Sequence, residues 1–226
     1  MPLLMKPIYT LLFLCFGLFG QLWAQPKPHQ KRQDLIFYII THNQFLNTPT
    51  YYETSWQSNE HRFQFMWETK PAKFFTLAYG LGYTSSNTHH NLALSTEPET
   101  GETEWNFLSS NSYERNYLNR KAVELPIEFR FRFRSPKDHV YRAYLGGSLG
   151  YQFANYSRLT TNQAKTSHHR LKALSPLQYG VYVKLGYRVL SLFAYYGFSP
   201  IFQNQTNTPN AFQNINQFSL GIAIGG

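Results

Sequence analysis

The chain has 226 residues, enough for one domain, with a formal net charge of +9 at pH 7 and a single cysteine, which excludes an internal disulfide framework. Lysines and arginines are spread along the chain without a compact patch. The charge therefore does not indicate nucleic-acid binding, and it better suits attraction to anionic lipid headgroups. Aromatic residues make up 18% of the chain and charged residues 15%, a balance that favours β structure.

The first segment, residues 1–24, has the features of a secretory signal peptide. Lys6 supplies the positive start, residues 11–22 form a short apolar run, and Ala24 ends the segment with a small residue. Leu14 precedes Cys15 where a lipoprotein signal would carry a small residue, so lipid attachment is not expected. We expect a signal peptide at 1–24 and one domain at 25–226, without a thiol and without a membrane-spanning helix.

Beyond the first segment, the chain repeats one pattern, the alternation of apolar residues with polar or very small ones. Such a period of two predicts β-strands with two different faces. The eight predicted strands cover residues 35–44, 61–68, 73–85, 123–134, 139–156, 177–188, 191–202 and 214–225.

The fourth strand, residues 123–134, shows the alternation most clearly. One face carries only apolar residues: Val123, Leu125, Ile127, Phe129, Phe131 and Phe133. The other face carries five charges and a proline: Glu124, Pro126, Glu128, Arg130, Arg132 and Arg134. Strands that are apolar on one face and charged on the other suit a barrel in a membrane, with lipid outside and a polar interior.

The connections between the predicted strands alternate between short and long. Residues 69–72, 135–138 and 189–190 form tight turns, whereas the other connections are long, the largest running over about 86–116. This alternation, with an even number of strands, is typical of outer-membrane barrels. We therefore expect an all-β fold, an eight-stranded antiparallel transmembrane β-barrel of the outer-membrane type, with both termini in the periplasm.

The charged faces predict a network of ion pairs in the lumen of the barrel. An eight-stranded barrel is only wide enough for its own side chains, so carboxylates and guanidinium groups should pair across it. Inward glycines would make room for them. The candidate residues are Glu124, Glu128, Arg130, Arg132, Arg62, Glu68, Arg142, Lys184 and Arg188. Two interpretations stay open: a salt-bridged plug, or a narrow pore for ions or protons.

Three segments resemble small outer-membrane barrels of the PorT-like type, a family of Bacteroidetes similar in architecture to OmpX. They are V-E-L-P-I-E-F-R-F from Val123, Y-R-A-Y-L-G-G-S-L-G-Y from Tyr141 and F-S-L-G-I-A-I-G from Phe218. The resemblance covers essentially all of residues 25–226. It implies an integral outer-membrane protein, in contact with outer-membrane lipid and lipopolysaccharide, and for some members a role in secretion. The chain departs from many barrels in ending on glycine, where they end on an aromatic residue.

The histidines raise the alternative of an outer-leaflet lipid A-modifying enzyme. His89 and His90 lie in the longest predicted loop, and His168 and His169 lie in the third, where Ser167 could form a dyad with His169. No third, orienting residue has a recognisable spacing, so we expect no catalytic residue, no metal and no cofactor. Our functional prediction is a non-catalytic barrel, a partner-binding or structural subunit of a cell-envelope assembly with an envelope protein as its partner.

Overall fold

A computed structural model describes residues 34–69, 75–97, 100–109, 112–134, 140–203 and 208–225. The predicted signal peptide at 1–24, the turn at 135–138 and most of the turn at 69–72 lie outside the described residues. No helix among the described residues is long and apolar enough to cross a membrane.

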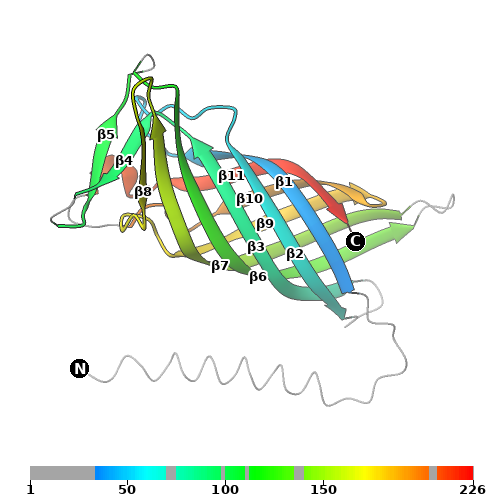
Figure 1. Cartoon of the computed structure of the whole chain (residues 1–226). Helices are drawn as coiled ribbons and strands as arrows, with labels where there is room; N and C mark the ends of the chain where they lie inside the picture. Colours follow the sequence, from blue (N-terminus) through cyan, green and yellow to red (C-terminus); the bar gives the residue numbers. More distant parts are fainter. Residues whose placement is uncertain are drawn as a thin grey trace, which may run out of the picture. The chain divides into compact units, whose positions relative to one another are not determined.

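Eight antiparallel strands close into a barrel (Figure 1). The sheet runs in the order β6-β3-β2-β1-β11-β10-β9-β7, and the pairing of β6 with β7 closes it. The strands are β1 (Asp34–Leu46), β2 (Asn59–Thr69), β3 (Thr76–His89), β6 (Arg115–Arg134), β7 (Val140–Thr160), β9 (Leu177–Tyr187), β10 (Leu190–Gly197) and β11 (Asn216–Gly225). The predicted fold class is thereby confirmed.

The barrel strands differ from the predicted segments mainly at their ends. β6 begins at Arg115, eight residues before the predicted start at Val123, whereas β10 already ends at Gly197. Three short strands and a turn of helix were not predicted: β4 (Leu92–Thr96), β5 (Thr103–Phe107), β8 (Lys165–His169) and η1 (Asn210–Phe212). The largest predicted loop therefore contains the β4–β5 hairpin.

The alternation of the sequence becomes an outer and an inner face of the barrel. On β2, Phe63 is 50% exposed, while its neighbour Arg62 is 2% exposed. The same holds for the apolar face of β6, where Val123, Leu125, Ile127 and Phe129 are all exposed. A continuous apolar outer wall with a buried polar interior is the arrangement that lipid around the barrel requires.

The two ends of the barrel have different connections. At the first, which we call the turn end, β9 and β10 join through a two-residue turn at Arg188 and Val189, with Arg188 at a φ of 53°. The predicted turn at 189–190 is thus displaced by one residue. The opposite end, which we call the loop end, carries the long connections and the β4–β5 hairpin. Figure 1 shows β1 beginning and β11 finishing at the same end.

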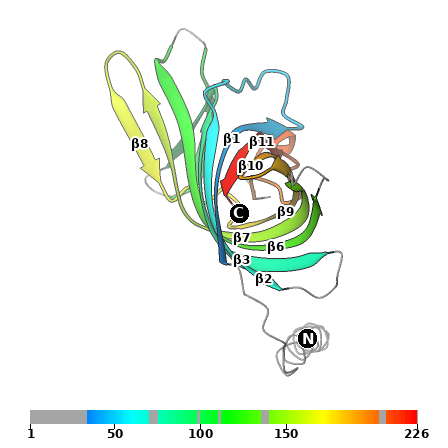
Figure 2. The same ribbon diagram turned by 90° about the vertical axis from the view of Figure 1, so that its right-hand side faces the viewer.

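Near the loop end, β7 changes partner. The register of β6 and β7 shifts between Lys121 and Ala122, so that Phe153 is an extra residue in β7. β7 pairs with β9 up to Tyr151 and with β8 from Tyr156 onward. Figure 2 shows β8 and the adjoining part of β7 extending away from the closed part of the barrel.

Four aromatic residues near the strand ends, Trp67, Tyr83, Tyr141 and Tyr187, lie in the outward phase of their strands. Tyr141 and Tyr187 form a ring pair at the turn end, with centroids 5.6 Å apart. Trp67 contacts Phe65 and Tyr79 near the end of β2. Tyr83 lies toward the loop end, beside Phe153. These positions suit the aromatic girdles that border the apolar band of such barrels.

Candidate functional site

The lumen of the barrel holds a network of buried charges, the candidate site that the sequence indicated. We call its eight ion-paired members the lumen network. They are Glu60, Arg62, Glu68, Glu124, Glu128, Arg130, Arg132 and Lys184. All of them project inward from β2, β6 and β9, because each lies in the inward phase of its strand.

The part of the network toward the turn end is built around two carboxylates. Glu128 accepts hydrogen bonds from Arg130 Nε at 2.7 Å and from Lys184 Nζ at 2.5 Å. Glu68 accepts from Arg130 Nη1 at 2.9 Å and from Arg132 Nη1 at 2.6 Å. Arg130 therefore bridges the two carboxylates and ties β2 to β6.

The second part lies farther toward the loop end. Arg62 donates from Nε to Glu60 at 2.7 Å and from Nη1 to Glu124 at 3.1 Å. Gln217 extends this group, because its amide nitrogen donates to Glu60 at 2.6 Å and its oxygen accepts from Arg120 at 2.6 Å. Strands β2, β6 and β11 are thereby linked across the lumen.

Aromatic rings fill the space between these charges. The Tyr182 hydroxyl donates to Glu128 at 3.0 Å. The ammonium group of Lys184 lies 4.2 Å from the centre of the Phe37 ring, and the guanidinium group of Arg62 lies 4.2 Å from the centre of the Tyr195 ring. Cation–π contacts of this kind stabilise a desolvated charge. The interior is thus packed with side chains, as the size of an eight-stranded barrel requires.

Inward glycines leave room for the large lumen side chains. A Cβ atom on Gly146 would overlap the ring of Tyr182, whereas a Cβ on its outward neighbour Gly147 would lie 3.5 Å from the nearest atom, the carbonyl oxygen of Gly180. Glycine is therefore required at position 146 by packing, and position 147 tolerates a side chain.

Seven of the nine predicted lumen residues meet in the network, and two lie elsewhere. Arg142 is half-buried and donates to the carbonyl oxygen of Gly225 at 3.0 Å. The prediction for Arg188 was wrong, because this residue lies exposed in the β9–β10 turn with its guanidinium group over the ring of Tyr187. A residue in the turn no longer follows the alternation of the strand.

Sequence reasoning missed four inward residues of the interior: Glu60, Gln64, Arg120 and Gln217. Glu60 and Arg120 lie just before the predicted starts of their strands, in phase with Arg62 and Glu124, so longer strands would have included them. Gln64 lay on the predicted inner face and accepts a hydrogen bond from Lys184, but it carries no charge and was not singled out. Gln217 also lay on the predicted inner face, carries no charge and was not singled out.

The loop end of the barrel is closed by a hydrophobic cluster, which we call the loop-end cap. Its buried members are Phe45, Tyr52, Leu92, Leu94, Leu118, Leu171, Leu174, Ile201, Phe202, Phe212 and Ile215. Trp105 of β5 packs on it, with its ring 4.9 Å from Phe202 and 5.3 Å from Phe212. The β4–β5 hairpin therefore belongs to the cap and covers the lumen network from this end.

The paired histidines form no common site. His90 is buried beneath the loops and stacks on Tyr52, and its Nδ1 accepts the backbone N–H of Leu92 at 3.1 Å. Burial lowers the pKa of His90 to about 3. His169 stacks on Tyr156, while the hydroxyl of Ser167 accepts a hydrogen bond from Arg158. No group of three potential metal ligands occurs among the described residues.

His42 and His61 form hydrogen bonds near the loop end of the wall. Nδ1 of His61 lies 2.7 Å from the hydroxyl of Tyr38. Nδ1 of His42 donates to the carbonyl oxygen of Ser58 at 2.8 Å. Both histidines therefore join β1 to β2.

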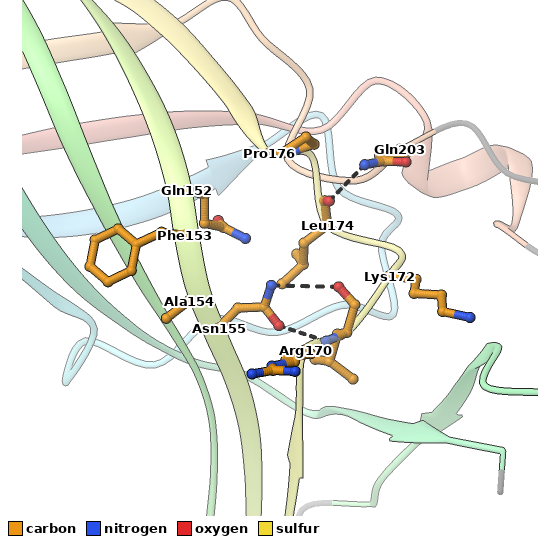
Figure 3. A pocket seen from close by; sticks show the side chains of 10 residues that line it. Gln152, Phe153, Ala154, Asn155, Arg170, Lys172, Leu174, Pro176 and Gln203 are labelled. Carbon is orange, nitrogen blue, oxygen red and sulfur yellow. Dashed lines mark hydrogen bonds between the residues drawn. The ribbon is translucent and has the colours of Figure 1, made fainter.

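An open cavity of about 360 Å³ lies where β7 parts from β9 (Figure 3). Its walls come from β7 and from the segment before β9, with Gln203 at one side. Asn155 crosses the gap, since its Oδ1 accepts from the N–H of Leu171 at 2.7 Å, and the N–H of Gln152 donates to the carbonyl of Pro176 at 2.7 Å. These bonds satisfy the edge of β7 between its two partner strands.

The family to which the chain belongs is shown by its sequence. A family model described as "Outer membrane protein beta-barrel domain" matches residues 62–203, which is more than half of the chain. No curated protein sequence matches the chain. The crystal structure of Ail, the attachment invasion locus protein of Yersinia pestis, is similar over 87% of this chain and 100% of its own, at 10% identity and a TM-score of 0.37.

A second solved structure, titled "Asymmetric conductivity of engineered proteins", is similar over 87% of this chain and 99% of its own, at 7% identity and a TM-score of 0.13. Similarities this low carry no argument about function. The family match is of a different kind, because it spans the strands that form most of the barrel. The chain belongs to the outer membrane protein beta-barrel domain family and is an integral protein of the outer membrane.

Proposed function

We propose that this barrel is a non-catalytic module of the cell envelope, a closed scaffold that binds a partner protein through its loop end. The observation that carries the proposal is the filled interior. The lumen network and its aromatic neighbours occupy the barrel, and the loop-end cap covers them. A barrel without room for substrate or solute supports a role in which its exposed loops make the contacts.

The proposal includes an orientation in the membrane. Short turns at one end and long connections at the other are typical of outer-membrane barrels, whose turns face the periplasm. The first barrel strand begins and the last one finishes at the turn end. We therefore assign the turn end and both termini to the periplasm, and the loop end to the outside of the cell.

Exposed aromatic residues at the loop end supply a surface for a partner. Trp56 is 83% exposed in the connection between β1 and β2. Tyr51 and Phe107 are also exposed and contact each other edge to face, with ring centroids 4.7 Å apart. Aromatic side chains exposed in this way are common at the centres of protein–protein interfaces.

Photo-crosslinking in living cells tests the partner proposal. With a benzophenone amino acid at position 56, we expect an adduct of defined size that is lost in the Tyr51→Ala/Phe107→Ala variant. Position 189, which is 58% exposed in the turn at the opposite end, provides the matched control. An adduct that survives the double substitution, or the same adduct from both positions, contradicts a partner site at the loop end.

The buried charges favour one second candidate, a narrow pore. In planar bilayers, the proposed scaffold produces no stepwise conductance, whereas a pore conducts and changes its ion selectivity with Glu128→Gln. Glu128 is fully buried in the middle of the network, so any conducting path would pass it. If the folded wild-type barrel conducts, the proposal of a closed scaffold is wrong and the protein is a pore.

The structure of lipid A in the cells tests whether the barrel is non-catalytic. Lipid A from cells that express the wild-type barrel, His90→Ala or His169→Ala is compared by mass spectrometry. We expect identical acylation in all three strains. An altered lipid A that needs either histidine would establish the enzyme alternative.

Within the family, the resemblance to the PorT-like type of Bacteroidetes supports a role in a secretion-related assembly. Deletion of the gene is expected to lower the amount of exported cargo outside the cell, with lipid composition unchanged. Restoration by the wild-type chain, but not by Tyr51→Ala/Phe107→Ala, would connect that role to the loop end. Normal export in the deletion strain would rule this role out.

A further inference from the structure

Above its apolar band, the outer wall of the barrel carries a row of neighbouring rings, in tilted and edge-to-face contact, that the proposed function does not use. The rings belong to His89 of β3, Tyr117 of β6, Tyr156 of β7 and His169 of β8, and we call them the ring ladder. Successive ring centroids are 5.3, 6.0 and 5.4 Å apart. All four residues lie in the outward phase of their strands, in line with Val123 and Tyr83 farther down. His169 is exposed and Tyr117 and Tyr156 are half-buried, whereas His89 is buried at the end of the row.

Guanidinium groups lie against these rings. Arg158 lies between two of them, with its central carbon 5.8 Å from the centre of the Tyr117 ring and 5.4 Å from that of Tyr156. Arg115 lies 5.5 Å from the centre of the Tyr117 ring on the other side. Lys165, on the outward face of β8, is exposed beside them. Stacking holds both guanidinium groups in place without neutralising their charge.

Among the described residues, the outward strand positions around the ring ladder carry no acidic side chain, and the nearest one in the chain is the exposed Glu114, just before β6. The remaining outward positions are neutral or basic: Ser85, Asn87, Asn119, Lys121, Ala154, Thr160 and Ser167. Among the described residues, no ion pair involves Arg115, Arg158 or Lys165. The surface is therefore a field of unneutralised positive charge over aromatic faces, and it is complementary to an anionic ligand.

The height of this surface above the apolar band restricts the kinds of lipid headgroup that can reach it. Tyr83, Val123 and Tyr151 form the last apolar row paired across three strands, with the exposed Phe153 in the bulge just beyond it, and Tyr117 lies six residues farther along β6 than Val123. Six residues span about 20 Å along a strand, or about 15 Å along the membrane normal at the usual tilt. The polar zone of a phospholipid leaflet is only about 5–8 Å thick.

We infer that the ring ladder, with Arg115, Arg158 and Lys165, binds the phosphorylated sugar headgroup of an outer-leaflet glycolipid. The acyl chains of such a lipid lie on the apolar band, which continues directly into the surface. Its sugar rings pack on the aromatic faces, and its phosphates accept hydrogen bonds from the two arginines. A phospholipid headgroup is too short to reach Arg158.

Binding of rough lipopolysaccharide to the folded barrel in neutral detergent tests this inference. A fluorescent lipopolysaccharide with phosphorylated lipid A and inner core is titrated with the protein, and anisotropy gives the affinity. Parallel titrations use the same lipid after dephosphorylation and a fluorescent phosphatidylglycerol, and inorganic phosphate is added as a competitor. We expect binding of the intact glycolipid to be at least about tenfold tighter than that of either other lipid.

Two arginines in similar surroundings provide matched variants. Arg158 and Arg188 each lie over a tyrosine ring, at 5.4 Å from Tyr156 and 5.3 Å from Tyr187, but at opposite ends of the barrel. Arg158→Gln should weaken glycolipid binding about tenfold, and Arg115→Gln/Arg158→Gln further, whereas Arg188→Gln should leave it unchanged. Heat-modifiable gel mobility confirms that each variant is folded. Conductance in planar bilayers tests the closed scaffold independently, so failure of the glycolipid site and failure of the scaffold give different results.

Each other result overturns the inference in a recognisable way. Equal affinity for phosphatidylglycerol would mean that the wall attracts any anionic lipid. Full competition by inorganic phosphate would mean a site for free phosphate. Unchanged binding in both arginine variants would place the glycolipid elsewhere. Loss of the loop-end crosslink in Arg158→Gln, with glycolipid binding intact, would assign the surface to the partner protein.

Discussion

The lumen network and the loop-end cap are both buried inside one barrel, yet opposite kinds of side chain build them. The network consists of charges that meet across the lumen from β2, β6 and β9, strands that do not pair with one another, and the cap consists of apolar side chains, many of them from the connections. The difference follows from what lies outside the wall. Where lipid surrounds the barrel, apolar side chains can stay on the outer face in contact with lipid, so the hydrophobic effect does not favour moving them inside. Polar contacts between the strands must therefore determine how the interior packs. Where water surrounds it, an ordinary hydrophobic core forms.

The change from one region to the other occurs within single strands. Along β6, Val123 and Leu125 are exposed on the outer face and Glu124 is buried inside, but nearer the loop end the inward side chain is the apolar Leu118 of the cap. On β1, Ile40 is exposed outside, while Phe45 belongs to the cap. The inversion marks the height at which lipid gives way to water.

Removal of a carboxylate from the network should have the largest effect. Glu128→Gln leaves Arg130 and Lys184 with one uncompensated buried charge, because both donate to Glu128. Loss of one partner of a buried ion pair costs about 3–5 kcal/mol. We expect a clearly lower temperature for the loss of heat-modifiable gel mobility.

Two other substitutions define the size of this effect. Arg130→Leu should destabilise the barrel less, since Glu68 keeps Arg132 and Glu128 keeps Lys184. Glu114→Gln, at an exposed position next to β6, should change nothing. A Glu128→Gln barrel as heat-resistant as the wild type would mean that the ion pairs do not hold the strands together.

A cavity in the cap should have a comparable but local effect. Phe212 is fully buried and contacts Tyr52, Trp105 and Phe202, so Phe212→Ala should cost the cap about 3 kcal/mol. We expect faster proteolysis within residues 92–107, measured on the folded barrel, with its heat-modifiable mobility unchanged.

The exposed Phe198 provides the control, because Phe198→Ala removes the same side chain from the surface at the same end. Faster proteolysis in both variants would mean that any change in the loops exposes this segment, and that a cavity in the cap is not the cause. A barrel that loses its heat resistance with Phe212→Ala would show that the cap and the network unfold together, and the two regions would then be one cooperative unit.

The sequence alone predicted the eight strands, their faces and most of the network, because one rule, apolar toward lipid and polar inward, holds from Val123 to Phe133. It did not predict the first eight residues of β6, where the rule inverts at Leu118, nor β4, β5 and β8. β4 and β5 owe their order to the cap, a set of contacts between residues far apart in the chain, and the polar β8 is held by its pairing with β7. Alternation within one segment contains no information about such contacts.

The two sides of the barrel wall can be compared with two adjacent glycines. Gly146→Ala places a methyl group against the buried ring of Tyr182, whereas Gly147→Ala points outward into open space. Overpacking of a filled interior costs about 1–3 kcal/mol, so the first variant should lose heat resistance and the second should keep it. Equal thermal stability of the two variants would mean that the lumen yields more readily than its packing suggests.

A pH titration should give the smallest effect, and it acts on the cap alone. The pKa of His90 is about 3 in the folded chain, well below its ordinary value of 6.5, because the ring is buried and lies near His89 and the positive charge of Arg120. Above pH 6.5 the ring is neutral in both the open and the closed cap. Below that pH only the open form takes up the proton, so the closed cap should lose about 1.4 kcal/mol per pH unit down to about pH 3.

Hydrogen exchange of residues 92–107 measures this opening, after correction for the intrinsic pH dependence of exchange. The N–H of Leu92 is the most direct probe, since it donates to His90. In His90→Asn, whose side-chain oxygen can still accept that hydrogen bond, we expect protection to be nearly independent of pH, whereas the exposed His169→Asn should retain the wild-type profile. If His90→Asn opened with acid as the wild type does, the acid sensitivity of the cap would have to come from its carboxylates, and the buried histidine would have no part in it.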